Sequence, residues 1–459
     1  GNPLPVGGIV GTASGTGYIR NCENHGNLSG VITAGGIVGT TINSTKPTKV
    51  SIENCVNSGA IHATGGAAGG ITATYSYDGK ENGLYLCRNT GNVTSVSGNA
   101  GGIAAQFTGK NSTQSVIEKC ENTATVTAKN YAGGIVGYVT NTANNAKAYV
   151  KNCANTNKVS SANTDTAGGL IGMLEIKFTN KNYKGSVNVE NSFSYQDGQK
   201  AIGSITNTNT KAGAPTGEIN YKHLYYLDES NPKDLSQGDT EQTALSSETF
   251  LGSGMVKKLN ENGNSFWGWN PRSTQNPEGS LYPVFNGFEK YPVCELRFIP
   301  FTDVDAGKYD IGIEGGTLSQ DSTEYYLDFA GRLTGKASIG SKDSETAAEA
   351  PIAVLVCNGK ATVYENSEDL TIPLDITADA QIYYGSKENY KSFVYTEWYD
   401  ETKNLFIIET AGQLQSVAKL VSSGKTFEGK TLKLGNDIDL SMVCSAEKGS
   451  WQPIGTTQN

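Results

Sequence analysis

The stretch Ala34–Asn57, AGGIVGTTINSTKPTKVSIENCVN, decides the fold because it joins two motifs that recur in phase along the chain. The glycine motif at its start, AGGIVG, occurs in six related copies between Gly7 and Gly172. The cysteine motif at its end, IENCVN, returns with spacings of 32 or 33 residues. Its cysteines are Cys22, Cys55, Cys87, Cys120 and Cys153, and the asparagines two residues later are Asn24, Asn57, Asn89, Asn122 and Asn155. Two phased motifs over this length indicate a repeat protein.

A glycine-rich repeat of about 33 residues, with β-branched residues alternating with small polar ones, predicts a solenoid. One repeat cannot bury its apolar face alone, whereas copies stacked about 4.8 Å apart hydrogen-bond from rung to rung. Equivalent residues then form ladders, in which the cysteines fill a narrow core and the asparagine amides bond between rungs. We therefore expect an all-β chain whose main part is a right-handed parallel β-helix over residues 1–215.

The rest of the chain divides by composition into three segments. Residues 216–290 are expected to cap the open end of the β-helix. Residues 291–390 carry short alternating strands between Gly, Asp and Ser turns, which is typical of an immunoglobulin-like β-sandwich. Residues 391–459 are expected to form a small α/β segment, with a helix that begins at a capping box made by Thr410 and Gln413.

The repeat units resemble a known family. The I-x-N-C-x-N-x-G-x-V and A-G-G-I-V-G units over residues 6–205 are similar to the GLUG-type repeats of bacterial cell-surface proteins. These repeats also occur in the non-catalytic region of bacterial IgA1-cleaving metallopeptidases. The segment Phe406–Gly455 resembles the block that precedes such repeats and caps the start of a β-helix. The resemblance implies an exported, non-peptidase protein, because the HExxH motif of the metallopeptidases is absent from the sequence.

The cysteines are interpreted as structural. Side chains directly opposite on neighbouring parallel strands point the same way, which strains a disulfide, so the ladder cysteines are expected to be free buried thiols. A bridge between Cys294 and Cys357 remains open on sequence grounds. The three histidines lie far apart in the sequence, which argues against a zinc site or a catalytic triad. No cofactor is expected.

Charge and composition limit the classes of partner. The net charge is −9, with a balance of +6 in residues 1–215 and −15 in the remainder. An acidic remainder without any nucleic-acid-binding motif argues against nucleic acid as a partner. No apolar stretch reaches the roughly 18 residues of a membrane span. We interpret the chain as part of a longer exported protein that is extracellular or held at the cell surface.

An enzyme that processes polysaccharide needs paired carboxylates facing one substrate. Asp78, Asp165 and Asp197 are the aspartates of residues 1–205, and they lie in different repeats without a second carboxylate in phase. The sequence therefore predicts a non-enzymatic adhesion or spacer module. The alternatives are a polysaccharide-processing β-helix enzyme and a purely structural stalk for an effector domain outside this chain.

A candidate binding surface follows from the spacing of the motifs. Length varies mainly between each glycine motif and the next cysteine, which places loops on one side of the solenoid. These loops are rich in lysine and tyrosine, a combination suited to an anionic glycan or a host surface protein. The candidate ligand-binding residues are Lys46, Lys49, Tyr75, Tyr77, Lys80, Lys110, Tyr138, Lys147, Lys177, Lys181, Tyr183 and Lys184.

The two ends of the chain predict self-association. Residues 6–39 are rungs without a cap before them, and Phe406–Gly455 resembles a cap without rungs after it. An open rung exposes unpaired backbone, which favours strand addition. We expect the C-terminal segment to cover this edge in its own chain or in a neighbouring one, and in the second case molecules would associate head to tail.

Overall fold

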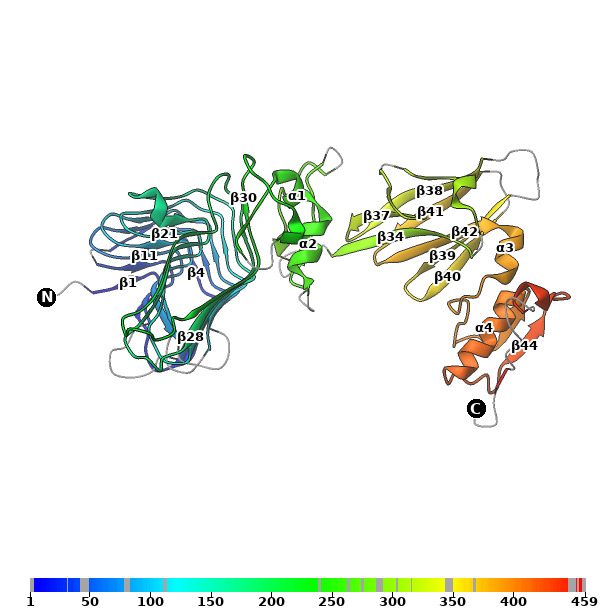
Figure 1. Ribbon diagram of the computed structural model, residues 1–459, viewed down its shortest axis with the longest axis horizontal. Helices are drawn as coiled ribbons and strands as arrows, with labels where there is room; N and C mark the ends of the chain where they lie inside the picture. The colour runs from blue at the N-terminus through cyan, green and yellow to red at the C-terminus, as the bar shows by residue number, and fades with distance from the viewer. Residues whose placement is uncertain are drawn as a thin grey trace. The chain divides into compact units, whose positions relative to one another are not determined.

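The computed structural model describes residues 4–30, 32–41, 49–77, 83–109, 114–237, 241–261, 265–273, 276–285, 292–302, 304–314, 316–342, 350–365, 369–444, 451 and 454–455. The chain divides into two compact units, Gly1–Phe288 and Glu289–Asn459. The first unit holds the repeats and the second holds a β-sandwich with a small α/β segment (Figure 1).

The first unit is a parallel β-helix in which each rung contributes strands to four sheets, here sheets A to D. Sheet A contains the first glycine of each glycine motif and the residue before it, which is Val6 in the first rung and alanine in the others, in β1 (Val6–Gly7), β6 (Ala34–Gly35), β11 (Ala68–Gly69), β16 (Ala100–Gly101), β21 (Ala132–Gly133) and β26 (Ala167–Gly168). Sheet B follows it along the chain, in β2 (Val10–Thr12), β7 (Val38–Thr40), β12 (Thr72–Tyr77), β17 (Ala104–Gly109), β22 (Val136–Asn141), β27 (Ile171–Phe178) and β29 (Ile202–Asn209). In Figure 1, β1, β11 and β21 follow one another along one side of the unit.

Sheets C and D complete each rung. Sheet C has one strand before each ladder cysteine, in β3 (Thr16–Arg20), β8 (Lys49–Glu53), β13 (Leu84–Tyr85), β18 (Gln114–Glu118) and β23 (Ala146–Lys151). It continues in the later rungs through β28 (Gly185–Ser194), β30 (Glu218–Leu227) and β31 (Thr243–Leu245). Its short strands lie after each cysteine, in β4 (Glu23–Asn24), β9 (Val56–Asn57), β14 (Arg88–Asn89), β19 (Glu121–Asn122) and β24 (Ala154–Asn155). Sheet D contains β5 (Leu28–Gly30), β10 (Ile61–Ala63), β15 (Val93–Ser95), β20 (Val126–Ala128) and β25 (Val159–Ser161).

A left-handed residue bends sheet C directly before each ladder cysteine. Its φ lies between 47° and 57° at Asn21, Asn54, Leu86, Lys119, Asn152, Asn191 and His223. Asparagine tolerates this region better than most residues, which explains why it stands at four of the six positions before the five ladder cysteines and Ser192. The bend turns the next side chain inward, so Cys55, Cys87, Cys120 and Cys153 are buried in the core, while Cys22 in the first rung is half-buried.

The cysteines are free thiols, as the sequence predicts. The Cys87 thiol contacts the carbonyl oxygen of Tyr85 at 3.4 Å in its own rung and that of Ile52 at 3.6 Å in the preceding one. Burial raises the pKa of the Cys120 thiol well above its ordinary value, and the neighbouring Cys153 and Cys87 thiols raise it further. Cys294 and Cys357 are also unbridged: their strands flank β42 (Ala380–Ser386) on opposite sides, which separates them.

The asparagines two residues after each cysteine form a continuous amide chain inside the β-helix. Each Nδ2 donates to the Oδ1 of the next rung's asparagine at 2.7–2.8 Å, from Asn24 to Asn155. The same Nδ2 also donates to the carbonyl oxygen two residues later in its own rung, at 2.7–2.9 Å. Both amide protons are therefore used, which meets the requirement for a buried amide.

The paired glycines leave the room that this amide chain needs. A Cβ on Gly70 would lie 1.9 Å from the Gly102 carbonyl oxygen and 2.4 Å from Asn89 Cγ. A Cβ on Gly69 would lie 1.8 Å from the carbonyl oxygen of Thr72, because the backbone turns sharply there. Real Cβ atoms do not approach this closely, so both glycines are required on steric grounds.

The last rung of the first unit is covered by a cap. It contains η2 (Leu235–Gln237), α1 (Ser247–Leu251), α2 (Ser253–Leu259), β32 (Trp267–Gly268) and β33 (Val284–Phe285), while η1 (Thr164–Thr166) is a turn within the repeats. Trp267 is fully buried, and its ring lies 5.2 Å from that of Phe193 and 4.8 Å from that of Phe285. Aromatic packing of this kind closes the apolar end of the core.

The second unit begins with two facing sheets. The larger has the order β36 (Ser319–Asp321), β37 (Glu324–Ala330), β34 (Val293–Pro300), β42, β39 (Pro351–Cys357) and β40 (Lys360–Tyr364). The smaller contains β35 (Tyr309–Ile313), which η4 (Ala306–Lys308) precedes, β38 (Leu333–Ser341) and β41 (Asp369–Ile376). Leu296 and Ile382 of the larger sheet and Ile339 and Ile372 of the smaller one share one buried core.

The α/β segment follows the sandwich through α3 (Lys387–Ser392). Its helix α4 (Ala411–Ser422) connects β43 (Leu405–Ile408) to β44 (Thr431–Leu434), which run parallel, and η6 (Leu440–Met442) follows. Thr410 and Gln413 form the predicted capping box. An apolar cavity of about 270 Å³ opens beside α4, lined by residues that include Phe427, Leu432 and Ile454.

The predicted fold class is confirmed: a parallel β-helix is followed by a β-sandwich and a small α/β segment. One sequence expectation was wrong in detail. The segments interpreted as variable loops are in part strands, because β12, β17, β22 and β27 extend into them and pair from rung to rung. The added residues of these strands are held by backbone hydrogen bonds to the neighbouring rungs, so fewer residues of each variable segment lie in loops than the sequence indicated.

Cysteine 87 tests whether the ladder is dry. Replacing Cys87 with Asp places a charge in the stack, and we expect the free energy of unfolding to fall by on the order of 3–5 kcal/mol in urea denaturation. Cys87→Ser is the control, because Ser192 lies next to Cys153 at the equivalent position. We expect it to cost about 1–2 kcal/mol. Equal losses for the two variants, or rapid labelling of Cys87 by a thiol reagent in the native protein, would contradict a dry stack.

Glycine 70 tests the steric link between the two motifs. Gly70→Ala should lower the free energy of unfolding by about 3 kcal/mol or more, because its Cβ would meet backbone and the Asn89 amide. Gly17→Ala is the matched control, since a Cβ at this strand position has no atom within 4 Å. Urea denaturation of both variants gives the comparison. Similar stabilities for the two would show that the rungs can separate to admit a methyl group.

Candidate functional site

Two charged surfaces of the first unit differ in whether their charged side chains form ion pairs. The turn strip is the row of outward residues that flank the bend before each ladder cysteine. The loop edge is the row of lysines where sheets B and C meet through loops. The turn strip includes Arg20, Glu53, Tyr85, Arg88, Glu118, Lys119, Glu121 and Lys151. The described lysines of the loop edge are Lys49, Lys147, Lys177, Lys181 and Lys184.

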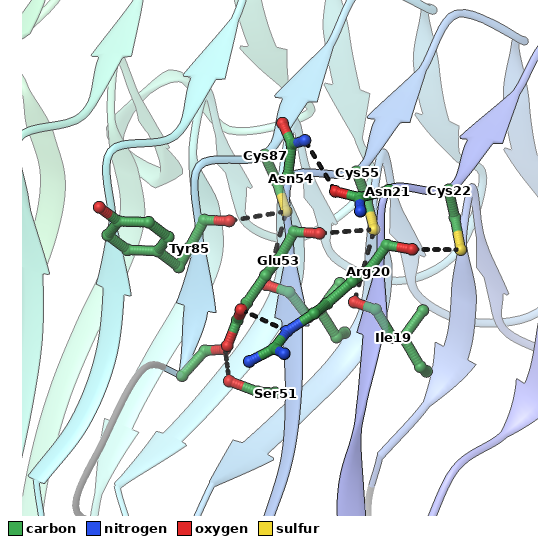
Figure 2. A network of polar contacts seen from close by, with 12 residues as sticks. Ile19, Arg20, Asn21, Cys22, Ser51, Glu53, Asn54, Cys55, Tyr85 and Cys87 are labelled. Atoms are coloured by element: carbon green, nitrogen blue, oxygen red, sulfur yellow. Dashed lines mark hydrogen bonds and ion pairs between the residues drawn. The ribbon is translucent and has the colours of Figure 1, made fainter. Parts of the chain in front are cut away.

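Ion pairs between neighbouring rungs occupy the turn strip. Arg20 Nε lies 2.7 Å from Glu53 Oε2, a contact visible in Figure 2 beside the row formed by Cys22, Cys55 and Cys87. Each such pair is partly exposed and contributes at most about 1 kcal/mol. The parallel register creates the pairs, because it places residues of successive rungs side by side.

Two further pairs continue the strip. Arg88 Nε lies 2.9 Å from Glu121 Oε2, and Lys151 Nζ lies 3.2 Å from Glu118 Oε2. Burial raises the pKa of the Glu121 carboxyl, and the Arg88 cation partly opposes this shift. Lys119 Nζ donates to the Tyr85 hydroxyl at 3.0 Å. The glutamates thus face cations rather than one another, and the strip joins rungs.

The in-phase glutamates of the turn strip were not among the residues predicted from the sequence. Their signal was available, since the position two residues before each ladder cysteine reads Arg20, Glu53, Tyr85, Glu118 and Lys151. The position after each cysteine holds Glu23, Arg88 and Glu121 in three of the rungs. Aligning every position on the cysteines would have shown charges of opposite sign in adjacent rungs. Such in-phase charges predict rung-to-rung ion pairs rather than a catalytic pair.

The loop edge differs because its lysines lack such partners. Lys49, Lys147, Lys177, Lys181 and Lys184 are exposed, and none forms an ion pair within the described part of the chain. Lys184 is held close to the preceding loop, since its backbone N–H donates to Asn144 Oδ1 at 3.2 Å. Lys46, Lys80 and Lys110 were also predicted for this surface, and they lie outside the described residues.

Two tyrosines predicted for the loop surface are in the core instead. Tyr75 is fully buried and Tyr77 is 6% exposed. Both lie on β12, where alternate side chains point inward, and their rings stack on one another at 6.2 Å. The Tyr75 hydroxyl donates to the Val50 carbonyl oxygen at 3.2 Å. Their assignment as ligand-binding residues is therefore wrong, because the loop interpretation hid the strand alternation.

The other two predicted tyrosines have different surroundings. Tyr183 is half-buried against the core, with its ring 6.1 Å from that of Phe178, so it anchors its loop. Tyr138 is half-buried on the outer face of β22. Its ring stacks on that of Tyr131 at 5.4 Å, and its hydroxyl donates to Glu175 Oε2. Burial, with the Glu175 carboxylate, raises the pKa of Tyr138 to about 12.

The described residues contain neither a grouped set of metal-ligating side chains nor a helix long and apolar enough to cross a bilayer. Comparison with protein families, with curated proteins and with solved structures found no match for this chain.

Proposed function

We propose that this chain is a non-enzymatic adhesion or spacer module of an exported bacterial surface protein, and that its loop edge binds acidic polymers. One observation carries the proposal. Charges on the turn strip are paired between rungs, whereas the described lysines of the loop edge are exposed without ion pairs. Unpaired cations gathered on one edge create a positive local potential in a chain whose net charge is −9.

The rigidity of the β-helix supports this use. Rungs repeat at about 4.8 Å, so side chains at one position are presented at a regular spacing along the axis. Lys147, for example, lies beside Gln114 in the register of sheet C, and Lys49 lies at the corresponding position of β8, three rungs earlier, in register with Thr16. A polymer with repeating negative charge suits such an array, which makes acidic glycan or an acidic segment of a host protein the expected ligand.

Charge reversal on the loop edge tests the binding. We expect Lys177→Glu, Lys181→Glu and Lys184→Glu together to lower affinity for immobilised heparin by about tenfold or more, since binding to polyanions depends on the cations that contact them. The wild-type affinity should fall as salt is raised. Surface plasmon resonance at two salt concentrations gives both values.

A matched triple variant controls for the change in total charge. Lys129, Lys158 and Lys200 are exposed and lie away from the loop edge, beside the strands of sheet D or at the start of sheet B. Their replacement by Glu removes the same charge, and we expect affinity to change less than about twofold because distant charges are screened. A similar loss of affinity in both triple variants would show that binding depends on the total charge of the protein and not on the loop edge. Failure of the wild-type protein to bind heparin would favour the alternative of a purely structural stalk.

We further propose that the module associates head to tail. Within the described residues, strands β1 to β5 each have a neighbour on one side only, and the first rung exposes Leu4 (78%) and Ile9 (50%). In the second unit, β44 pairs only with β43 within the described residues, and Leu432 and Leu434 are 40% and 57% exposed. Both edges accept a parallel strand, and joining them would cover apolar surface on each copy.

A single charge at the free edge of β44 tests this association. Leu434→Glu should abolish a rise in mass with protein concentration, because it places a charge where apolar residues would meet. Val363→Glu is the control, since Val363 is 39% exposed on β40 in the same unit. Sedimentation velocity on the full chain measures the effect. A wild-type protein that stays at 48.5 kDa at every concentration would rule the association out.

A further inference from the structure

One rung of the β-helix carries a feature that the others lack. Tyr131 stands directly before the glycine motif, at a position occupied elsewhere by Thr33, Ala67, Asn99 and Thr166. Tyr138 lies in register with Gln106 on one side and Met173 on the other. Only this described rung has aromatic side chains at both positions, and the two rings stack at 5.4 Å with an interplanar angle of 26°.

The next rung places a carboxylate beside this pair. Glu175 lies on the outer face of β27, and its Oε2 accepts the hydrogen bond of the Tyr138 hydroxyl. The Tyr138 phenol is protonated at neutral pH and donates this hydrogen bond, and burial beside the Glu175 carboxylate raises its pKa to about 12. Glu175 Oε1 makes no hydrogen bond within the described residues, so it remains available to a donor from a ligand.

A cation follows along the same strand. Lys177 is two residues after Glu175, so both side chains leave the same face of β27, about 7 Å apart. Lys177 is exposed, and Thr208 of β29 lies beside it in the register. The outer face of these two rungs therefore presents, in order, a pair of aromatic rings, a hydrogen-bond acceptor and a cation.

We infer that this row, Tyr131, Tyr138, Glu175 and Lys177, is a subsite for an acidic monosaccharide unit of a polysaccharide. The apolar face of a sugar ring packs on the tyrosines, one of its hydroxyls donates to Glu175 Oε1, and its carboxylate pairs with Lys177. The inference rests on the proposed function and names its ligand class. A polyanion without sugar rings would use the lysines but not the tyrosines.

Two unsulfated carboxylate polymers separate the subsite from the loop edge. Polygalacturonate has sugar rings and polyglutamate has none. We expect the double variant Tyr131→Ala and Tyr138→Ala to lower affinity for polygalacturonate about tenfold, while affinity for polyglutamate changes less than about twofold. Isothermal titration calorimetry on the full chain measures both affinities.

Two controls keep the result tied to the rings. Tyr138→Phe retains the ring and removes the hydroxyl, so most of the polygalacturonate affinity should persist. The variant Tyr18→Ala with Tyr149→Ala removes two tyrosines from the outer face of sheet C and should leave both affinities unchanged. Circular dichroism and thermal unfolding identify any variant that fails to fold.

The outcomes distinguish this inference from the function on which it rests. If the double variant at Tyr131 and Tyr138 binds polygalacturonate as tightly as the wild-type protein, the subsite is refuted while the lysine edge stands. A folded double variant that loses both polymers equally refutes it too, because the rings would then not discriminate. If the wild-type protein binds neither polymer, the subsite fails, and if it also fails to bind heparin, the proposed binding of acidic polymers by the loop edge fails with it.

Discussion

The amide chain from Asn24 to Asn155 is the constraint on which the β-helix depends. Each amide must donate to the next rung and to its own backbone, so the distance between rungs and the position of every asparagine are fixed together. The amides fit because the second glycine of each motif, such as Gly70, has no side chain to occupy the space. The two motifs are therefore one structural unit, although about twenty residues separate each glycine from the asparagine that it contacts.

The sequence predicted the parts of this unit that repeat. In-phase cysteines, asparagines and glycines are enough to infer stacked rungs, and the capping box at Thr410 is a local signal that needs no tertiary contact. The alternation within β12 was missed, because Tyr75 and Tyr77 lie where the repeat length varies and the motif gives no register. Strand pairing with the neighbouring rung, which decides that register, is a long-range property.

The candidate surfaces likewise contain residues that were predicted from the sequence and residues that were not. Five lysines of the loop edge were predicted and are exposed, since an unpaired lysine is rarely buried whether it lies in a loop or on the outer face of a strand. Tyr131 was missed because a single aromatic residue breaks the repeat rather than following it. The partnership of Tyr138 with Glu175 joins two rungs 37 residues apart, and only the three-dimensional register brings them together. Departures from a repeat therefore deserve as much weight as the repeat when a binding surface is sought.

The direction of the amide chain has a consequence for how such a protein can change in length. Each Asn side chain from Asn24 to Asn122 donates toward the following rung, so the chain has a polarity, and a whole inserted repeat meets a donor behind it and an acceptor ahead of it. Gain or loss of a complete unit, as unequal recombination of the coding repeats produces, preserves each contact and alters only the axial length by about 4.8 Å. Gain or loss of part of a repeat would instead move the asparagines out of register and break these hydrogen bonds. Selection can thus adjust the reach of the module in discrete steps without redesigning its core.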